Sequence, residues 1–222
     1  MNNFAIIVAG GSGTRMNATV PKQFMILSAR PVLMHSIESF FRFDSALPIL
    51  VVLPKSEIEN WKKLCGEYSF DVEHEIVAGG ETRFHSVQNG LGRLNGNGLV
   101  AIHDGVRPFL SLRLLETVFA EAAKNGSAVP VLSLNESIRE LIPGGSKPAV
   151  RSRFMSVQTP QCFDLAKIRA AYQTEYRKEF TDDACVFEFA GNKLHTVEGT
   201  RENIKITWPS DLLLAESLMK TR

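Results

Sequence analysis

A glycine-rich segment and two basic residues follow the first apolar run of the sequence. Gly10-Gly11-Ser12-Gly13-Thr14-Arg15 comes directly after Phe4–Ala9, and Pro21-Lys22-Gln23 comes shortly afterwards. Glycines let backbone N–H groups close around a phosphate, because no Cβ stands in the way. Two cations beside such a cradle favour phosphoryl or nucleotidyl transfer, in which catalysis is mostly positioning and charge stabilisation. The same glycines could instead form only a turn between a strand and a helix.

The spacing of this segment excludes three familiar motifs. The dinucleotide fingerprint needs a glycine where Met16 stands, and a Walker loop needs Gly-Lys-Ser/Thr, which is absent. The esterase elbow fails by one residue, because Gly10-x-Ser12-x ends in Thr14. A phosphate-binding loop of another kind remains.

Two later segments place polar residues after further apolar runs. Gly79-Gly80-Glu81-Thr82-Arg83 opens a predicted helix, and His103-Asp104-Gly105-Val106-Arg107-Pro108 follows a predicted strand. Asp104 could hold a ribose hydroxyl or a hydrated magnesium ion, or it could only cap the turn that follows. Arg107 is either a surface residue or a cation in the same crevice as Asp104.

The remaining candidates have a structural alternative each. Thr181-Asp182-Asp183 is typical of a helix N-cap with an acidic first turn. Lys205 lies in an apolar-alternating run, so it is either a solvated strand lysine or a cation that points into the site. The five histidines lack the spacing of a metal site, and we expect a core or surface role for each of them: His35, His74, His85, His103 and His195.

Short Val/Ile-rich runs alternate with amphipathic segments through the first 132 residues. The expected strands are Phe4–Ala9, Ile49–Leu53, Asp71–Val77, Leu99–His103 and Ser127–Leu132. The expected helices are Val32–Phe43, Ser56–Glu67, Arg83–Leu94 and Leu112–Lys124, the last with Ser111 as its N-cap. Such alternation predicts a Rossmann-like α/β fold, a mainly parallel sheet flanked by helices with a ligand crevice at the carboxyl ends of its strands.

The alternation stops near residue 132. A Gly/Pro-rich turn over Pro143–Pro148 separates two extended runs, Ile138–Ile142 and Ala149–Met155, which predicts an inserted β-hairpin. The pattern then resumes with a helix near Asp164–Tyr176, a strand at Lys193–Val197 and a last helix from Ser210. We therefore expect one domain over residues 1–222 with a β-arm at about 133–156. An arm of this kind most commonly contacts a second copy of the chain, as in a homodimer.

Composition and charge narrow the class of protein. The chain has 25 basic and 24 acidic residues among 222, a net charge of +1, and 44% of its residues are apolar. This balance is typical of an ordinary globular protein and argues against general binding to nucleic acid or membrane surfaces. The apolar runs fall far short of the roughly 20 residues of a membrane span. We expect a cytoplasmic protein without an export signal, in which Cys65, Cys162 and Cys185 are buried thiols.

Six motifs in order carry a resemblance to a known family. They are Gly10–Arg15, Pro21-Lys22-Gln23-Phe24, His103–Pro108, Gln158-Thr159-Pro160-Gln161, Thr181-Asp182-Asp183-Ala184, and Val197-Glu198-Gly199 with Asn203–Thr207. The first resembles the opening of the sugar-nucleotidyltransferase superfamily. Together they resemble the 2-C-methyl-D-erythritol 4-phosphate cytidylyltransferases of the non-mevalonate isoprenoid pathway, over almost the whole chain. The resemblance implies a Rossmann-like homodimer with a protruding β-arm. It also implies the reaction of CTP with methylerythritol 4-phosphate, with Mg²⁺ held mainly by the triphosphate.

The resemblance also implies a role for individual residues. Charge on the α-phosphate would be stabilised by Arg15, Lys22 and Lys205. The nucleotide would contact Ala9, Gly10, Gly11, Ser12, Gly13, Gly80, Glu81, Ser86, Asp104 and Gly105. The acceptor phosphate would contact Asp104, Arg107, Thr159 and Thr181, together with Ser137 and Arg151 of the arm, the latter reaching over from a partner subunit.

Two positions depart from the family's pattern. Glu81 stands where the family commonly has Asp. The first run of the arm, residues 130–137, does not match the usual Pro-Val-x-Asp-Thr, so the arm's hydroxyl is assigned to Ser137.

Three other activities remain open from the residues. A ribitol-5-phosphate cytidylyltransferase would differ mainly in its acceptor, and Thr181–Ala184 with Arg151-x-Arg153-Phe154 favours methylerythritol phosphate over it. A hexose-1-phosphate nucleotidyltransferase shares the first loop but not the later motifs. Arg15, Lys22 and Lys205 together argue against a non-catalytic nucleotide-binding module.

Overall fold

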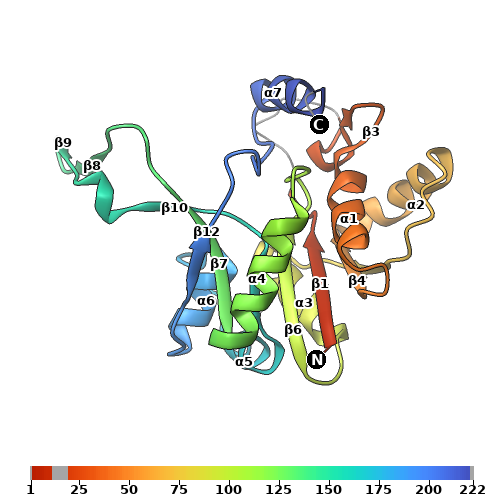
Figure 1. Cartoon of the computed structure of the whole chain (residues 1–222), viewed down its shortest axis with the longest axis horizontal. Helices are drawn as coiled ribbons and strands as arrows, with labels where there is room; N and C mark the ends of the chain where they lie inside the picture. Colours follow the sequence, from red (N-terminus) through yellow and green to blue (C-terminus); the bar gives the residue numbers. More distant parts are fainter. Residues whose placement is uncertain (1, 12–19, 221–222) are drawn as a thin grey trace.

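A mainly parallel sheet with helices on both faces forms the centre of the molecule (Figure 1). The computed structural model describes residues 2–11 and 20–220. Within these ranges, eight strands form the sheet. Their spatial order is β10 (Met155–Val157), β7 (Ser127–Ser133), β11 (Gln161–Asp164), β6 (Gly98–Asp104), β1 (Asn2–Val8), β4 (Ile49–Leu53) and β5 (Glu75–Ala78), with β12 (Thr196–Glu198) also paired to β7.

The central strands are parallel and buried on both faces. β1 pairs in parallel with β4 on one side and with β6 on the other, and β4 pairs in parallel with β5. Successive side chains of a strand point to opposite faces, so Ala5 and Ile7 pack in one core while Ile6 and Val8 pack in the other. Strands covered on both faces need near-continuous apolar sequence, which is why these runs could be recognised. The predicted fold class is confirmed.

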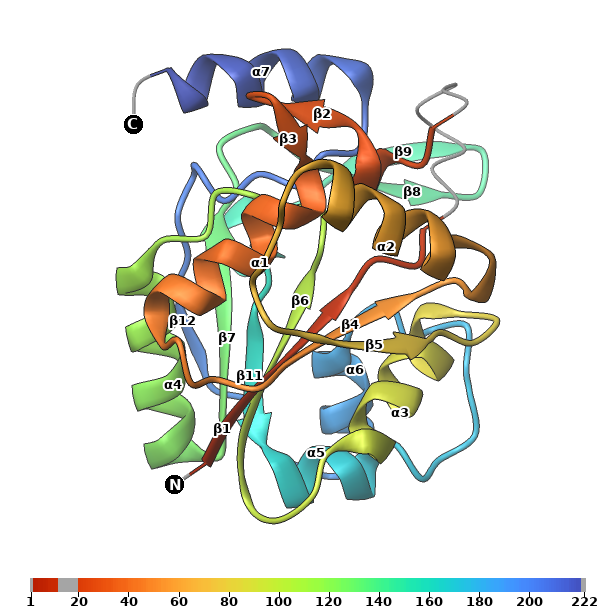
Figure 2. The same ribbon diagram turned by 90° about the vertical axis from the view of Figure 1, so that its right-hand side faces the viewer.

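Helices cover both faces of the sheet (Figure 2). One core contains apolar side chains of α1 (Val32–Phe43), α2 (Ile58–Glu67) and α4 (Leu112–Asn125). The other contains those of α3 (Arg83–Arg93), α5 (Leu165–Ala171) and α6 (Asp183–Phe189). The Ser111 side chain caps α4 by accepting a hydrogen bond from the Leu114 N–H, as predicted. No helix in the described parts of the chain combines the length and apolar character needed to cross a membrane.

A third, smaller core lies above the carboxyl ends of the strands. It joins a hairpin of β2 (Ile26–Leu27) and β3 (Arg30–Pro31), which the sequence analysis missed, to α7 (Pro209–Met219). Ile206 is fully buried in this core, and its N–H donates to the Val106 carbonyl at 2.9 Å. This anchor places the preceding residue, Lys205, beside the end of β6.

β11 runs against its neighbours and was not predicted. It pairs antiparallel with both β6 and β7. An antiparallel strand begins at the edge where parallel strands end, so the residues just before Gln161 lie next to the end of β6. Accordingly, the Asp104 N–H donates to Thr159 Oγ1 at 3.0 Å. A single four-residue strand in reverse direction leaves no alternating signal from which sequence could identify it.

The hairpin of the arm forms, but its second strand was placed wrongly. β8 (Arg139–Ile142) pairs with β9 (Gly145–Pro148), inside the segment predicted as a turn, and residues 149–154 are not strand. The turn needs only Pro143-Gly144, because Gly144 adopts a left-handed φ of 79°. Met155–Val157 is β10 and pairs with β7 in the main sheet.

Other boundaries differ from the prediction by a few residues. The strand expected from Asp71 begins at Glu75, the helix expected to Tyr176 ends at Ala171, and the strand expected at Lys193–Val197 is Thr196–Glu198. A 3₁₀ turn, Lys55–Glu57, precedes α2, which begins at Ile58 rather than Ser56. Seen in Figure 1, the arm projects from the body of the chain. The single-domain division and the arm's role in dimerisation stay predictions.

Candidate active site

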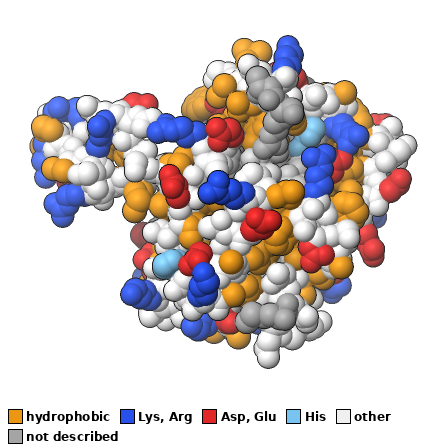
Figure 3. All heavy atoms as spheres, viewed as in Figure 1, with side chains coloured by type: hydrophobic (Ala, Val, Ile, Leu, Met, Phe, Trp, Pro, Cys, Tyr) orange, Lys and Arg blue, Asp and Glu red, His pale blue; other side chains and the backbone are white. Residues whose placement is uncertain are grey.

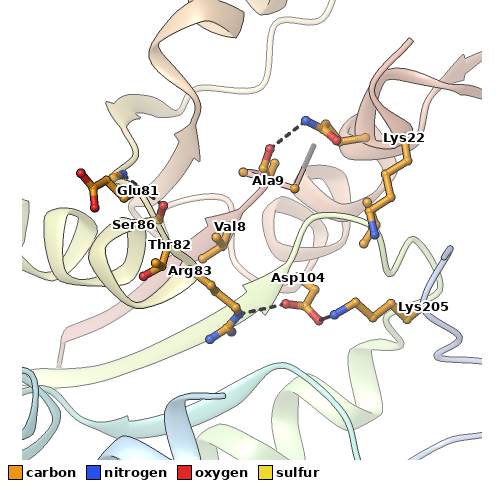
Figure 4. A pocket seen from close by; sticks show the side chains of 14 residues that line it. Val8, Ala9, Lys22, Glu81, Thr82, Arg83, Ser86, Asp104 and Lys205 are labelled. Atoms are coloured by element: carbon orange, nitrogen blue, oxygen red, sulfur yellow. Dashed lines mark hydrogen bonds and ion pairs between the residues drawn. The ribbon is translucent and has the colours of Figure 1, made fainter. Parts of the chain in front are cut away.

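A cavity of about 250 Å³ opens at the carboxyl ends of β1 and β6 and the beginning of α3. Figure 4 shows the side chains around it. Its lining contains Val8, Ala9, Gly10, Gly11, Lys22, Gln23, Gly80, Glu81, Thr82, Arg83, Ser86, Asp104, Val106 and Lys205. This is the edge of a doubly wound sheet at which ligands bind. We call it the nucleotide cavity, after the ligand that the sequence analysis predicts for these residues.

Asp104 is the central charged group of this cavity. Its Oδ1 lies 3.4 Å from Arg83 Nε, and its Oδ2 lies 2.8 Å from Lys205 Nζ and 3.6 Å from Arg107 Nε. Burial opposes ionisation of this carboxyl, but the three cations together hold its pKa well below the usual range. Asp104 is therefore an anion that fixes cations, and Lys205, whose side chain is 40% exposed, directs its ammonium group to Asp104 at the cavity (Figure 4).

The first strand and the turn after Pro21 form one wall of the cavity. Gly10 and Gly11 line it directly, so two of the predicted loop glycines lie where a phosphate could approach. Lys22 begins a short 3₁₀ helix and is only 9% exposed. The neighbouring Gln23 donates from Nε2 to the Ala9 carbonyl at 2.9 Å, which ties this helix to the end of β1. The predicted Ser12, Gly13 and Arg15 lie outside the described residues.

The opposite wall comes from the beginning of α3. The Thr82 side chain caps this helix by accepting from the His85 N–H. Ser86 Oγ accepts a hydrogen bond from the Gly80 N–H at 3.2 Å, so the loop and the first turn of the helix are joined. A Cβ on Gly80 would collide with the His85 side chain, which explains the glycine. Glu81 is exposed at the rim, on the side of the cavity away from Lys205 (Figure 4).

A second cavity, also of about 250 Å³, adjoins the first. It is lined by Arg83, Asp104, Arg107, Val157, Gln158, Thr159, Gln161, Thr181, Asp182 and Lys205. The predicted acceptor residues Arg107, Thr159 and Thr181 therefore lie together. Arg83, Asp104 and Lys205 line both cavities. We call the second one the acceptor cavity, after the predicted role of these residues.

Buried hydrogen bonds hold Thr159 in place. Because the buried His103 Nε2 lies 3.1 Å from the Arg107 carbonyl, it must donate, and Nδ1 then accepts from Thr159 Oγ1, 3.1 Å away. Thr159 Oγ1 in turn accepts from the Asp104 N–H. Burial is the main cause that lowers the pKa of His103 to about 4, so the ring is neutral near pH 7. His103 has a structural role, as expected.

Asn203 supports the neighbouring cation, Arg107. Arg107 is only 8% exposed, and its Nη1 donates to the Asn203 carbonyl at 2.8 Å. The Asn203 side chain donates to the Thr159 carbonyl at 2.8 Å. The segment around Lys205 and the segment before β11 are therefore joined at the acceptor cavity.

The sequence analysis missed Arg83 and Asp183 as site residues. Arg83 Nη1 and Nη2 donate to Asp183 Oδ1 and Oδ2 at 2.9 and 2.7 Å, while Arg83 Nε faces Asp104. The two residues are 100 positions apart in the chain. Each begins a helix, α3 or α6, and only the fold brings these helix ends together. The acidic first turn at Asp182-Asp183 was the available signal, but it pointed to helix capping alone.

Three predicted residues lie elsewhere. Gly105 lies behind the nucleotide cavity, where its N–H donates to the Val8 carbonyl and a Cβ would meet Leu33 Cδ1 at 2.8 Å. Ser137 and Arg151 belong to the arm and are not among the residues that line either cavity. Arg151 donates to the Asn135 carbonyl within the arm. In the parts of the chain that the structure describes, no three His, Cys, Asp or Glu residues form a metal-binding group.

Comparisons with known proteins agree on one family. A family model described as IspD, 2-C-methyl-D-erythritol 4-phosphate cytidylyltransferase, matches residues 3–221. Curated proteins of that name from Bacteroides fragilis and Phocaeicola vulgatus are each 48% identical. The first match covers 97% of this chain and 98% of the relative, and the second covers 99% and 100%.

Solved structures give the same result. A 2-C-methyl-D-erythritol 4-phosphate cytidylyltransferase from Thermus thermophilus superposes with a TM-score of 0.80 at 31% identity, covering 99% of this chain and 100% of that one. A 4-diphosphocytidyl-2C-methyl-D-erythritol synthase from Anaerococcus prevotii gives a TM-score of 0.83 at 29% identity, covering 99% and 96%. The cavity at the strand ends, the full-length match and the shared fold lead to one conclusion: the chain belongs to the 2-C-methyl-D-erythritol 4-phosphate cytidylyltransferase family.

Proposed function

We propose that this protein transfers the cytidylyl group of CTP to 2-C-methyl-D-erythritol 4-phosphate, giving 4-diphosphocytidyl-2-C-methyl-D-erythritol and pyrophosphate for isoprenoid synthesis. The observation that carries the proposal is that two adjoining cavities share Arg83, Asp104 and Lys205. A transfer between two phosphorylated substrates needs such a place, where both approach the same fixed charges.

The reaction needs no covalent enzyme intermediate. A phosphate oxygen of the acceptor attacks the α-phosphorus of CTP, and the bond from that phosphorus to the bridging oxygen breaks. The electron pair leaves with pyrophosphate, so negative charge grows on the bridging oxygen. Lys22 and Lys205 both line the nucleotide cavity on the side away from Glu81 (Figure 4) and supply positive charge for it, and Arg15 is assigned the same role.

The beginning of α3 and the end of β1 hold the nucleotide in this scheme. Backbone N–H groups of Gly10 and Gly11 face the triphosphate. Gly80, Glu81 and Ser86 face the base, where a carboxylate acceptor favours the exocyclic amine of cytosine over the carbonyl of uracil.

The polar groups of the nucleotide cavity fit a magnesium ion bound through the triphosphate. Asp104 offers a hard carboxylate that remains ionised, and Mg²⁺ is commonly bound by one or two carboxylates together with substrate phosphates. Because Arg83 and Lys205 already lie against the two oxygens of Asp104, the triphosphate would hold the ion in the main, with Asp104 beside it. When bound, Mg²⁺ neutralises charge on the triphosphate.

The acceptor cavity binds the polyol phosphate. Arg107 and Thr159 are held rigidly by Asn203 and His103, and Thr181 lines the same cavity. Rigid donors discriminate between acceptors better than mobile ones, because the cost of orienting them is already met.

The arm contacts the second subunit of a homodimer. It gathers large exposed apolar side chains in one short segment, which is typical of an interaction surface: Leu141 is 86% exposed, and Val150, Phe154 and Met155 are at least half exposed. Figure 3 shows Lys and Arg side chains on the same projection. In this arrangement Ser137 and Arg151 complete the acceptor cavity of the partner. Cys162 is buried as expected, whereas Cys65 and Cys185 are only partly buried. That all three are free thiols supports a reducing cytoplasmic location.

Pyrophosphate release with CTP and a panel of acceptors tests the function. We expect turnover with methylerythritol 4-phosphate and little with ribitol 5-phosphate or hexose 1-phosphates. UTP should replace CTP poorly. Equal rates with ribitol 5-phosphate would contradict the assigned acceptor, and equal rates with UTP would contradict the role of Glu81.

Two lysine substitutions, one of them a control, test in the same assay whether Lys205 stabilises the transition state. Lys205→Ala should lower kcat about 10²–10³-fold, because it removes one preorganised cation at the transition state. Lys63→Ala is the matched control, since Lys63 is an exposed lysine of α2 whose side chain pairs with Glu67. Near-normal turnover of Lys205→Ala would remove that lysine from the mechanism.

A further inference from the structure

The Arg83 guanidinium lies between the carboxylates of Asp183 and Asp104 and contacts them with different geometry. Its two terminal nitrogens donate to Asp183, which is completely buried, and its Nε faces Asp104 Oδ1 at 3.4 Å. The Asp183 contacts are shorter and bidentate, which is the strongest geometry for a pair of this kind. Arg83 is therefore fixed mainly by Asp183.

Asp183 is itself held from a third direction. The Tyr172 hydroxyl donates to Asp183 Oδ1 at 2.6 Å, and Tyr172 is only 1% exposed. The Tyr172 ring stacks on Phe84, with ring centroids 4.7 Å apart. Asp183 thus connects the beginnings of α3 and α6 through a rigid, buried set of contacts.

This arrangement decides how the oxygens of Asp104 are shared. Arg83 contacts Asp104 Oδ1 through Nε alone. Asp104 Oδ2 lies 2.8 Å from Lys205 Nζ and 3.6 Å from Arg107 Nε. A guanidinium that is free to turn presents two parallel N–H groups to a carboxylate and occupies both of its oxygens. Without Asp183, Arg83 would compete with Lys205 for Asp104.

We propose that Asp183 is a positioning residue for the transfer: it holds Arg83 so that only one oxygen of Asp104 is taken, which leaves the other to orient Lys205. Asp183 lines neither cavity and acts through Arg83. The inference rests on the proposed function, because its effect is read as cytidylyl transfer. Wild-type enzyme without turnover would contradict the function, whereas active wild type with an equally active Asp183 variant would contradict only the inference.

Asp183→Asn is the first test. The amide keeps the shape of the carboxylate but loses the charge that holds Arg83. We expect kcat to fall about 10²-fold through misplacement of Lys205. The KM for CTP should stay within about three-fold, because the segments assigned to hold the nucleotide, Gly10-Gly11 and Gly80 with Ser86, keep their positions when Arg83 is released. A kcat within about three-fold of wild type would overturn the proposal.

Tyr172→Phe is the matched control for damage to the buried cluster. It removes one hydrogen bond of Asp183 but leaves both Arg83 contacts. We expect a lower melting temperature with kcat within about two-fold of wild type. If this variant loses as much kcat as Asp183→Asn, the effect is general loss of structure and the proposal fails.

The double variant Arg83→Gln with Asp183→Asn completes the test. It replaces both charges by amides, so it should fold even where Asp183→Asn does not, because no unpaired charge is buried. If Asp183 acts only through Arg83, the double variant should match Arg83→Gln within about two-fold in kcat. If the kcat of the double variant is instead lowered by the product of the two single-variant effects, Asp183 acts independently of Arg83 and the proposal is overturned.

Discussion

At the scale of single residues, burial and neighbouring charge fix the protonation states on which the site depends. Asp104 remains charged because three cations surround it, and His103 remains neutral because it is buried between a carbonyl and a hydroxyl. Asp104 is an anion that orients the cations around it, and His103 is a neutral side chain whose hydrogen bond holds Thr159 in place. Adjacent residues of one strand thus have opposite tasks, since their side chains point to opposite faces.

The neutral state of His103 makes stability depend on pH. Its pKa is lowered from 6.5 to about 4 in the folded chain, so between these values the unfolded chain binds a proton that the folded chain does not. Stability should therefore fall as pH falls from about 6.5 towards 4, by about 3 kcal/mol for this group. The measurement is the free energy of unfolding by urea at several pH values.

His103→Gln is the comparison for that measurement. Its free energy of unfolding should vary less over this pH window than that of wild type, while the half-buried His35 and His74, whose pKa values are also lowered, contribute equally to both. Asp104 loses its contribution only at lower pH, below the usual carboxyl range, because its pKa is depressed. Parallel pH curves for the two proteins would contradict the role of His103.

At the scale of elements, helix beginnings and strand ends bring the polar residues together. α3 begins at Arg83 and α6 at Asp183, and β6 ends at Asp104. Each element points its end toward the same edge of the sheet. Because the sequence shows where a buried strand ends, Asp104 and Lys22 could be predicted as neighbours of the site.

Other features of the site lay beyond what sequence could predict. β1, β4 and α1 were recognisable, because strong apolar patterns marked them. The reversed strand β11 carries no such pattern, and the Arg83–Asp183 pair joins residues that only the completed fold brings into contact. Polar partners distant in sequence follow from how elements pack, and local spacing says nothing about them.

Two helix caps offer an element-scale prediction. Thr82 caps α3 beside the nucleotide cavity, and Ser111 caps α4 away from it. Thr82→Ala and Ser111→Ala should each cost about 1 kcal/mol of stability, or roughly 2–4 °C in melting temperature. Only Thr82→Ala should also raise the KM for CTP, because it loosens the turn that carries Ser86. Equal KM values for CTP in the two variants would show that the cap of α3 has no effect on nucleotide binding.

At the scale of the whole molecule, the arm is the part that a single chain does not explain. Its hairpin projects from the body (Figure 1), and Figure 3 shows apolar and basic side chains together on this projection. The arm contains the exposed Leu141 and Phe154 as well as Arg139, Arg151 and Arg153. Ser137 and Arg151 lie in this arm rather than at the cavities of their own chain. A twofold dimer in which each arm covers the other subunit's acceptor cavity would account for both observations.

Complementation tests the shared site. Inactive Lys22→Ala and Arg151→Ala subunits are mixed, dissociated and allowed to reassociate. With exchanged arms, one site of each mixed dimer combines intact Lys22 with intact Arg151, so roughly a quarter of all sites should recover. Turnover measured after mixing should rise accordingly. If Arg151 serves its own subunit, every site keeps one defect and the mixture stays as inactive as its components.

The two cavities draw on different stretches of the chain. Apart from Lys205, the nucleotide cavity is lined by residues between 8 and 106, whereas the acceptor cavity adds Arg107 and residues between 157 and 182 to the three shared ones. Under the proposed function, the donor and the acceptor would therefore bind to separate parts of the sequence, which meet at Arg83, Asp104 and Lys205. Such a division lets one part diverge while the other stays fixed. A library of substitutions confined to positions 157–182 should yield enzymes with new polyol phosphates as acceptors that still use CTP.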